Sequence, residues 1–209
     1  MKEIKKSVIT NIDTNYEKIK SQFETPYNSS DFDFLREEIC KCILFDLNQA
    51  AITLTNHFVE NFLKTMLEYQ EVRDNKSNNI DLATKLKESV EKYDDQNLEK
   101  NINMACSKGV ITKDQKKILK KLKDKYRNPY SHSIKTKIFG NDSLKGFQIN
   151  QKSDLGENLI SEVKDYKISD SPQLHGLFQM FKSKGEATEY FIEFDSIVRE
   201  TLDSFYKNS

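Results

Sequence analysis

The scarcity of glycine and proline constrains this chain more than any other feature. Only six glycines and three prolines occur among its 209 residues. Tight turns between short strands depend on these residue types, whereas lysine and glutamate, which are plentiful here, favour helices. The sequence therefore predicts an all-α fold, an antiparallel helical bundle. A chain of this length can bury one sizeable core, so we expect residues 1–209 to form a single domain.

The centre of the bundle is predicted between residues 31 and 72. This stretch reads as helical throughout, but it is too long for one typical globular helix, so we place a break near residues 46–49. The second helix, about 48–71, is apolar on most sides, which predicts a long central helix that is the most buried element. Its apolar residues are Ala51, Ile52, Leu54, Phe58, Val59, Phe62, Leu63, Met66 and Leu67.

Amphipathic helices are expected on both sides of this centre. Apolar residues spaced by three and four predict an accessory helix within residues 1–30, which can pack on the bundle or on a second copy of the chain, and a final helix over about 186–206. Shorter helices are expected between residues 80 and 126, where Gly109 ends one and Thr112 caps the next.

Residues 136–185 form an irregular insertion. The segment "KIFGNDSLKGFQIN" (137–150) can form a short β-hairpin, whereas "LISEVKDYKI" (159–168) is ambiguous between helix and strand. The segment "PQLHGLFQMF" (172–181) predicts a short helix opened by Pro172.

Charge and hydropathy narrow the choice of partners. The formal net charge is zero, so attraction to nucleic acid or to an anionic membrane would require a local basic patch. The sequence has no apolar run of 18 residues, and residues 1–20 alternate charged and hydrophobic residues too regularly for us to expect a signal peptide there. The three cysteines fit a reducing compartment as small apolar residues. We therefore expect a cytoplasmic protein with no membrane partner.

Familiar catalytic motifs are missing from the sequence. It contains no G-x-G-x-x-G, Walker A, H-E-x-x-H, paired C-x-x-C or G-x-S-x-G pattern. Dinucleotide binding, P-loop hydrolysis, zinc binding and serine-hydrolase activity thus have no sequence support, and we expect neither a cofactor nor a metal.

One segment, "KKLKDKYRNPYSHSIK" (120–135), combines two informative residues, Arg127 and His132. Asn128 and Pro129 are the preferred pair for an N-cap and first helical position, which predicts a helix junction with His132 in the first turn of a new helix, beside an anion site made by its N–H groups. The alternative is a kink in one continuous helix. In a purely structural interpretation, Arg127 caps the preceding helix and His132 binds a neighbouring helix.

The segment "YRNPYSHS", the preceding "GVITKDQ" and the upstream "LNQAAITLTNHFVENFLK" together resemble the HEPN superfamily (higher eukaryotes and prokaryotes nucleotide-binding domains). Members have a small helical bundle with an R-x(4–6)-H signature, often with a polar residue such as Asn128 directly after the arginine. The resemblance covers roughly residues 31–135 and the last helix, and leaves residues 1–30 and 136–185 unaccounted for. A family variant with tyrosine two positions after the histidine is not matched, because Ile134 stands there.

The resemblance implies a metal-independent endoribonuclease of toxin or antiviral-defence type. It would act as a homodimer with a composite site, cleave RNA to a 2′,3′-cyclic phosphate, and have an antitoxin or regulatory protein as a partner. Arg127 would stabilise the charge on the phosphate, and His132 would transfer protons. Asn128 would have a positioning role by orienting the His132 ring. These roles suit the chemistry of the three side chains. The alternative is a catalytically inactive module that binds a nucleotide, RNA or a protein.

Further residues around the pair complete the predicted site. Lys121 and Lys125 are expected to bind RNA phosphates, and Tyr126 and Tyr130 to stack on bases. On the central helix, His57 and Glu60 belong to a polar cluster with Asn56 and Asn61. We interpret this cluster as a buried, satisfied network, or alternatively as support for the Arg127 and His132 site, with Glu60 the first residue to test.

Overall fold

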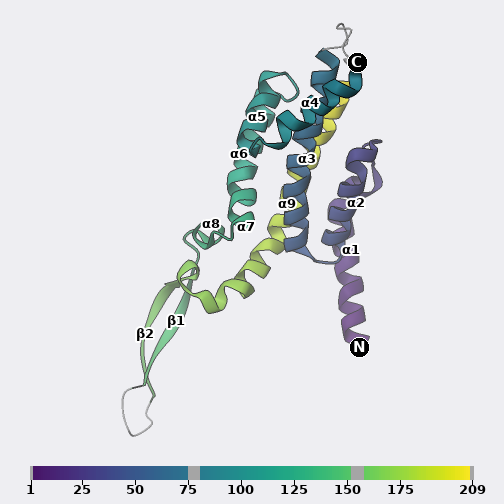
Figure 1. Cartoon of the computed structure of the whole chain (residues 1–209). Coiled ribbons are helices and arrows are strands. Elements are labelled where there is room, and N and C mark those ends of the chain that lie inside the picture. The colour runs from purple at the N-terminus through teal and green to yellow at the C-terminus, as the bar shows by residue number, and fades with distance from the viewer. Residues whose placement is uncertain (1, 75–80, 152–157, 208–209) are drawn as a thin grey trace.

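The computed structural model describes residues 2–74, 81–151 and 158–207, and these residues form helices joined by short loops, together with one hairpin (Figure 1). The all-α prediction is confirmed. The elements are α1 (Lys2–Glu24), α2 (Ser30–Leu44), α3 (Asn48–Asp74), α4 (Leu82–Asp94), α5 (Leu98–Ser107), α6 (Lys113–Leu122), a π-helical turn (Lys123–Arg127), α7 (Asn128–Ser131), α8 (Lys135–Phe139), β1 (Ser143–Gln151), β2 (Asn158–Lys167), two 3₁₀ turns (Ile168–Asp170 and Pro172–Leu174) and α9 (His175–Lys207).

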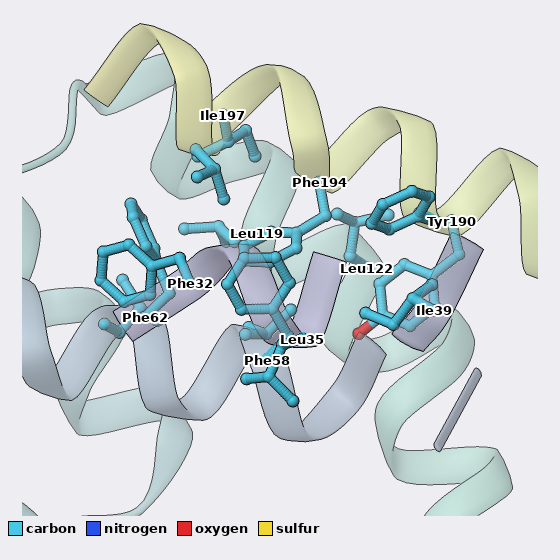
Figure 2. Packing of buried hydrophobic residues seen from close by; sticks show 14 of the residues in the cluster. Phe32, Leu35, Ile39, Phe58, Phe62, Leu119, Leu122, Tyr190, Phe194 and Ile197 are labelled. Carbon is cyan, nitrogen blue, oxygen red and sulfur yellow. The ribbon is translucent and has the colours of Figure 1, made fainter. Parts of the chain in front are cut away.

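Helix α3 lies at the centre of the bundle, as its apolar pattern predicted. It packs against α2, α4, α5 and α9, and α6 also contacts α9. Figure 2 shows α2, α3, α6 and α9 sending side chains into one core, in which the rings of Phe58 and Phe194 meet edge to face with centroids 5.1 Å apart. The same cluster of buried apolar residues includes Ile19 of α1 and Leu202 near the C-terminus. These helices therefore share one core.

Local signals at the helix ends are also confirmed. The break between α2 and α3 contains Asp46 with φ of 61°, and Gly109 follows α5 with φ of 74°. Thr112 caps α6 in a reciprocal capping box, since its hydroxyl accepts from the Gln115 N–H at 3.1 Å while its own N–H donates to the Gln115 side chain at 2.8 Å.

Helix α1 packs on the bundle through its C-terminal half. Ile19 is fully buried, whereas Val8 and Ile9 are exposed in the half that runs past α2 (Figure 1). Of the two expectations for this accessory helix, packing on the bundle is therefore observed for its C-terminal half.

The insertion differs from its prediction in two ways. The hairpin is longer than expected, because β1 pairs antiparallel with β2, the segment left ambiguous by its sequence, and Ser143 lies opposite Lys167. The expected short helix and final helix are one continuous helix, α9, which passes through Gly185. A glycine within a helix costs only about 1 kcal/mol, and the packing of α9 along α3 outweighs this cost.

Among residues 2–74, 81–151 and 158–207, no helix combines the length and apolar character needed to cross a lipid bilayer.

Candidate functional site

The helical chain does not break at Asn128. From Lys113 to Ser131 it remains helical, and Asn128 itself has φ of −65° and ψ of −46°. The predicted junction is therefore wrong, and the alternative, one continuous irregular helix, is observed. A wide π-helical turn, in which the Asn128 N–H donates to the Lys123 carbonyl, precedes Pro129, which has no N–H to donate. Because no helix begins at Pro129, the expected anion site at a helix N-terminus is also wrong.

Arg127 and His132 nevertheless meet. Nη1 of Arg127 lies 3.3 Å from Nε2 of His132, and the imidazole is exposed. His132 is the C-cap of α7, with φ of −107° and ψ of 7°, and Ser133 follows at φ of 50°. The chain therefore leaves helical geometry at the histidine, and the long Arg127 side chain spans the remaining gap.

Glu60 on α3 holds the guanidinium in place. Its Oε1 accepts from Nε of Arg127 at 2.9 Å and forms an ion pair with Nη2 at 2.9 Å, which leaves Nη1 directed at His132. Oδ1 of Asn128 is 3.4 Å from the same Nη1, and its Nδ2 donates to Asp124 at 3.2 Å. The Asn128 side chain thus contacts Arg127, whereas Asn128 is joined to His132 through the backbone, since the His132 N–H donates to the Asn128 carbonyl at 3.3 Å.

A second connection joins α3 to α7 one turn away. Nδ2 of Asn56 donates to Oγ of Ser131 at 3.3 Å, while Oδ1 of Asn56 accepts from the Tyr190 hydroxyl at 2.9 Å. The sequence interpretation did not single out Ser131. The available signal was its spacing, since a residue four positions after Arg127 lies on the same helical face.

His57 lies apart from this arrangement. It is exposed on α3, and among the residues that the structure describes its side chain makes no hydrogen bond or ion pair. A residue one position after Asn56 is rotated by about 100° around the helix, which points His57 away from α7. The predicted polar cluster therefore divides, with Asn56 and Glu60 facing the site and His57 facing elsewhere.

The lysines expected to bind RNA are paired with carboxylates of α9. Nζ of Lys121 lies 3.3 Å from Glu193, and Nζ of Lys125 lies 3.1 Å from Glu189. Both lysines are exposed, and these carboxylates offset part of their charge. Phosphate binding by Lys121 and Lys125 stays a prediction.

The two tyrosines differ in exposure. Tyr126 is fully buried and stacks on Tyr190 with centroids 4.5 Å apart, and burial raises its pKa to about 12. The prediction that Tyr126 stacks on bases is wrong, because the ring stacks on Tyr190 and has no exposed surface on which a base could lie. Tyr130 is half-buried, and its hydroxyl donates to Glu186 at 2.5 Å; burial and this hydrogen bond raise its pKa. Base stacking by Tyr130 stays a prediction.

Searches for similar proteins among protein-family models, curated proteins and solved structures find no match. In the described part of the chain, no three His, Cys, Asp or Glu side chains gather closely enough to hold a metal ion. The geometry of Arg127, His132 and their neighbours is therefore the basis for a functional assignment.

Proposed function

We propose that this chain is a HEPN-like, metal-independent endoribonuclease. The observation that carries the proposal is the exposed contact between Arg127 and His132, in which Glu60 fixes the guanidinium. These two side chains supply what RNA cleavage needs, a permanent positive charge for the phosphate and an imidazole that can accept or donate a proton. The proposed setting, a cytoplasmic toxin or defence protein with a regulatory protein partner, rests on the family resemblance.

The geometry suggests an order of events. Because arginine only donates hydrogen bonds, Nε2 of His132 acts as the acceptor in the observed contact. An RNA phosphate competes for Nη1 of Arg127 and releases the lone pair of Nε2. His132 then takes the proton of the 2′-hydroxyl, the 2′-oxygen attacks phosphorus, and a 2′,3′-cyclic phosphate forms as the 5′-oxygen leaves.

The leaving 5′-oxygen needs a proton from a second group. A homodimer provides one, since His132 of a second copy, in its protonated form, can act as the acid while the first acts as the base. This division of roles supports the proposed composite site between two copies.

A second candidate is a module that binds a nucleotide, RNA or protein without cleaving RNA. The observation in its favour is the density of carboxylates, since Glu60 engages Arg127 while Glu189 and Glu193 engage neighbouring lysines. Carboxylates at these places weaken the attraction for an RNA backbone.

Incubation of labelled RNA with the protein in EDTA separates the two candidates. We expect the wild type to leave ends with a 2′,3′-cyclic phosphate, and Arg127→Ala and His132→Ala to abolish cleavage. Absence of cleavage by the wild type, or cleavage that survives both substitutions, would rule out the endoribonuclease.

A further inference from the structure

We infer that Ser131 is a third ligand-contacting residue of the site, with a hydroxyl that donates to a phosphate oxygen beside Arg127. This inference rests on the proposed function, because it assigns the phosphate of an RNA backbone as the ligand. In it, Asn56 and Tyr190 are positioning residues that act through Ser131.

The positioning begins in the core. Tyr190 is 1% exposed and stacks on Tyr126, so its hydroxyl has a fixed direction toward Asn56. That hydroxyl donates to Oδ1 of Asn56, which orients the amide so that Nδ2 points at Ser131. Asn56 is itself 6% exposed. If the amide turned over, the buried Tyr190 hydroxyl would accept from Nδ2 and its own hydrogen would lose its acceptor, which favours the observed orientation.

The hydrogen bonds from Tyr190 to Asn56 and from Asn56 to Ser131 leave the Ser131 hydroxyl free to act as a donor. Its oxygen accepts from Asn56, and in the part of the chain that the structure describes its hydrogen is donated to no acceptor. A serine hydroxyl has one hydrogen to donate, and accepting a hydrogen bond strengthens it as a donor. Ser131 is exposed, so this donor faces solvent.

The position of Ser131 makes a phosphate the fitting ligand. It directly precedes His132 and lies one helical turn after Arg127, while its partner Asn56 lies one turn before Glu60 on α3. The contact of Glu60 with Arg127 and that of Asn56 with Ser131 thus hold a guanidinium and a hydroxyl on the same helical face. A phosphate has several anionic oxygens, so one can bind Arg127 while another accepts from Ser131.

The test compares Ser131→Ala, Ser131→Thr and Tyr190→Phe, with Ser196→Ala as a control at an exposed serine of α9 whose hydroxyl donates to Glu200. Cleavage of labelled RNA is measured, and in parallel the affinity for a 2′-O-methyl RNA oligonucleotide, which cannot be cleaved, is measured by fluorescence anisotropy. Circular dichroism checks that each variant folds.

We expect Ser131→Ala to weaken binding or lower kcat/KM by about 10- to 100-fold, the range for a hydrogen bond to a charged group. Ser131→Thr restores most of the loss because it keeps the hydroxyl, Tyr190→Phe causes a smaller loss, and Ser196→Ala causes none. A folded Ser131→Ala variant that matches the wild type in both assays overturns the inference and leaves the endoribonuclease intact. Weaker binding by this variant, when the wild type binds RNA without cleaving it, supports the inference and rules out the enzyme. A wild type that neither binds nor cleaves RNA overturns both.

Discussion

Replacement of Glu60 by alanine separates the function of the site from the stability of the fold. The carboxylate of Glu60 and the guanidinium of Arg127 are 35% and 27% exposed. An ion pair with this much solvent contact contributes at most about 1 kcal/mol, or about 2–4 °C in Tm for a chain of this size. The same carboxylate makes both contacts that aim Nη1 at His132. Misplacement of a reacting group by about 1 Å can reduce a rate about 100-fold.

We therefore expect Glu60→Ala to lower RNA cleavage by about 10- to 100-fold while unfolding stays within about 1 kcal/mol of the wild type. Cleavage is followed in single-turnover assays and stability by urea denaturation. Glu37→Ala is the control, since Glu37 is an exposed glutamate that pairs with Lys41 on α2 and, within the described residues, contacts no residue of the predicted site. A cleavage rate equal to the wild type would refute the positioning role, and a loss of stability well above 1 kcal/mol would identify Glu60 as a structural residue.

Three further predictions concern the fold. Partial burial raises the pKa of Glu71, but hydrogen bonds from Lys108, Tyr93 and Lys92 outweigh it and lower this pKa to about 2. Because the folded-state pKa is depressed, the stability from Glu71 is present above about pH 4.5 and lost as the pH falls toward 2. After allowance for solvent screening we expect about 1–2 kcal/mol. Denaturant titrations across this range should show that Glu71→Gln loses less stability on acidification than the wild type; equal losses contradict the assignment. Gly109→Ala should cost about 1–2 kcal/mol, because alanine at φ of 74° is strained although the space is open, and a smaller fall in the urea midpoint than this implies would show that the turn relaxes. Thr112→Ala should cost about 1 kcal/mol through loss of the α6 cap, whereas Thr112→Ser, which keeps the hydroxyl, should stay near the wild type in the same assay.

Short-range chemistry explains why most of the bundle was predictable. The break before α3, the end of α5 at Gly109 and the cap of α6 at Thr112 depend on residues within a few positions of one another. The burial of α3 followed from apolar residues on most sides of that helix. In contrast, the pairing of β1 with β2 and the continuity of α9 through Gly185 depend on contacts between distant segments.

In the candidate site too, some features were predictable from neighbouring residues and others depended on contacts between distant segments. The spacing of Arg127 and His132 selected two residues of one short segment whose side chains the structure brings within 3.3 Å of each other. The junction at Asn128 was predicted from local preference, and the helix instead continues through a π-helical turn. Tyr126 could not be recognised as a core residue, because its burial depends on Tyr190, which is 64 positions away.

The sequence by itself determined the helical class, the buried central helix and the presence of an arginine and a histidine in one segment, because propensity, periodicity and spacing act over a few residues. Only the tertiary structure decided that Glu60 and Asn56 reach from α3 to Arg127 and Ser131, and that α9 carboxylates pair with the lysines. These contacts join residues more than 60 positions apart, and their geometry depends on how α3, α7 and α9 pack around a shared core.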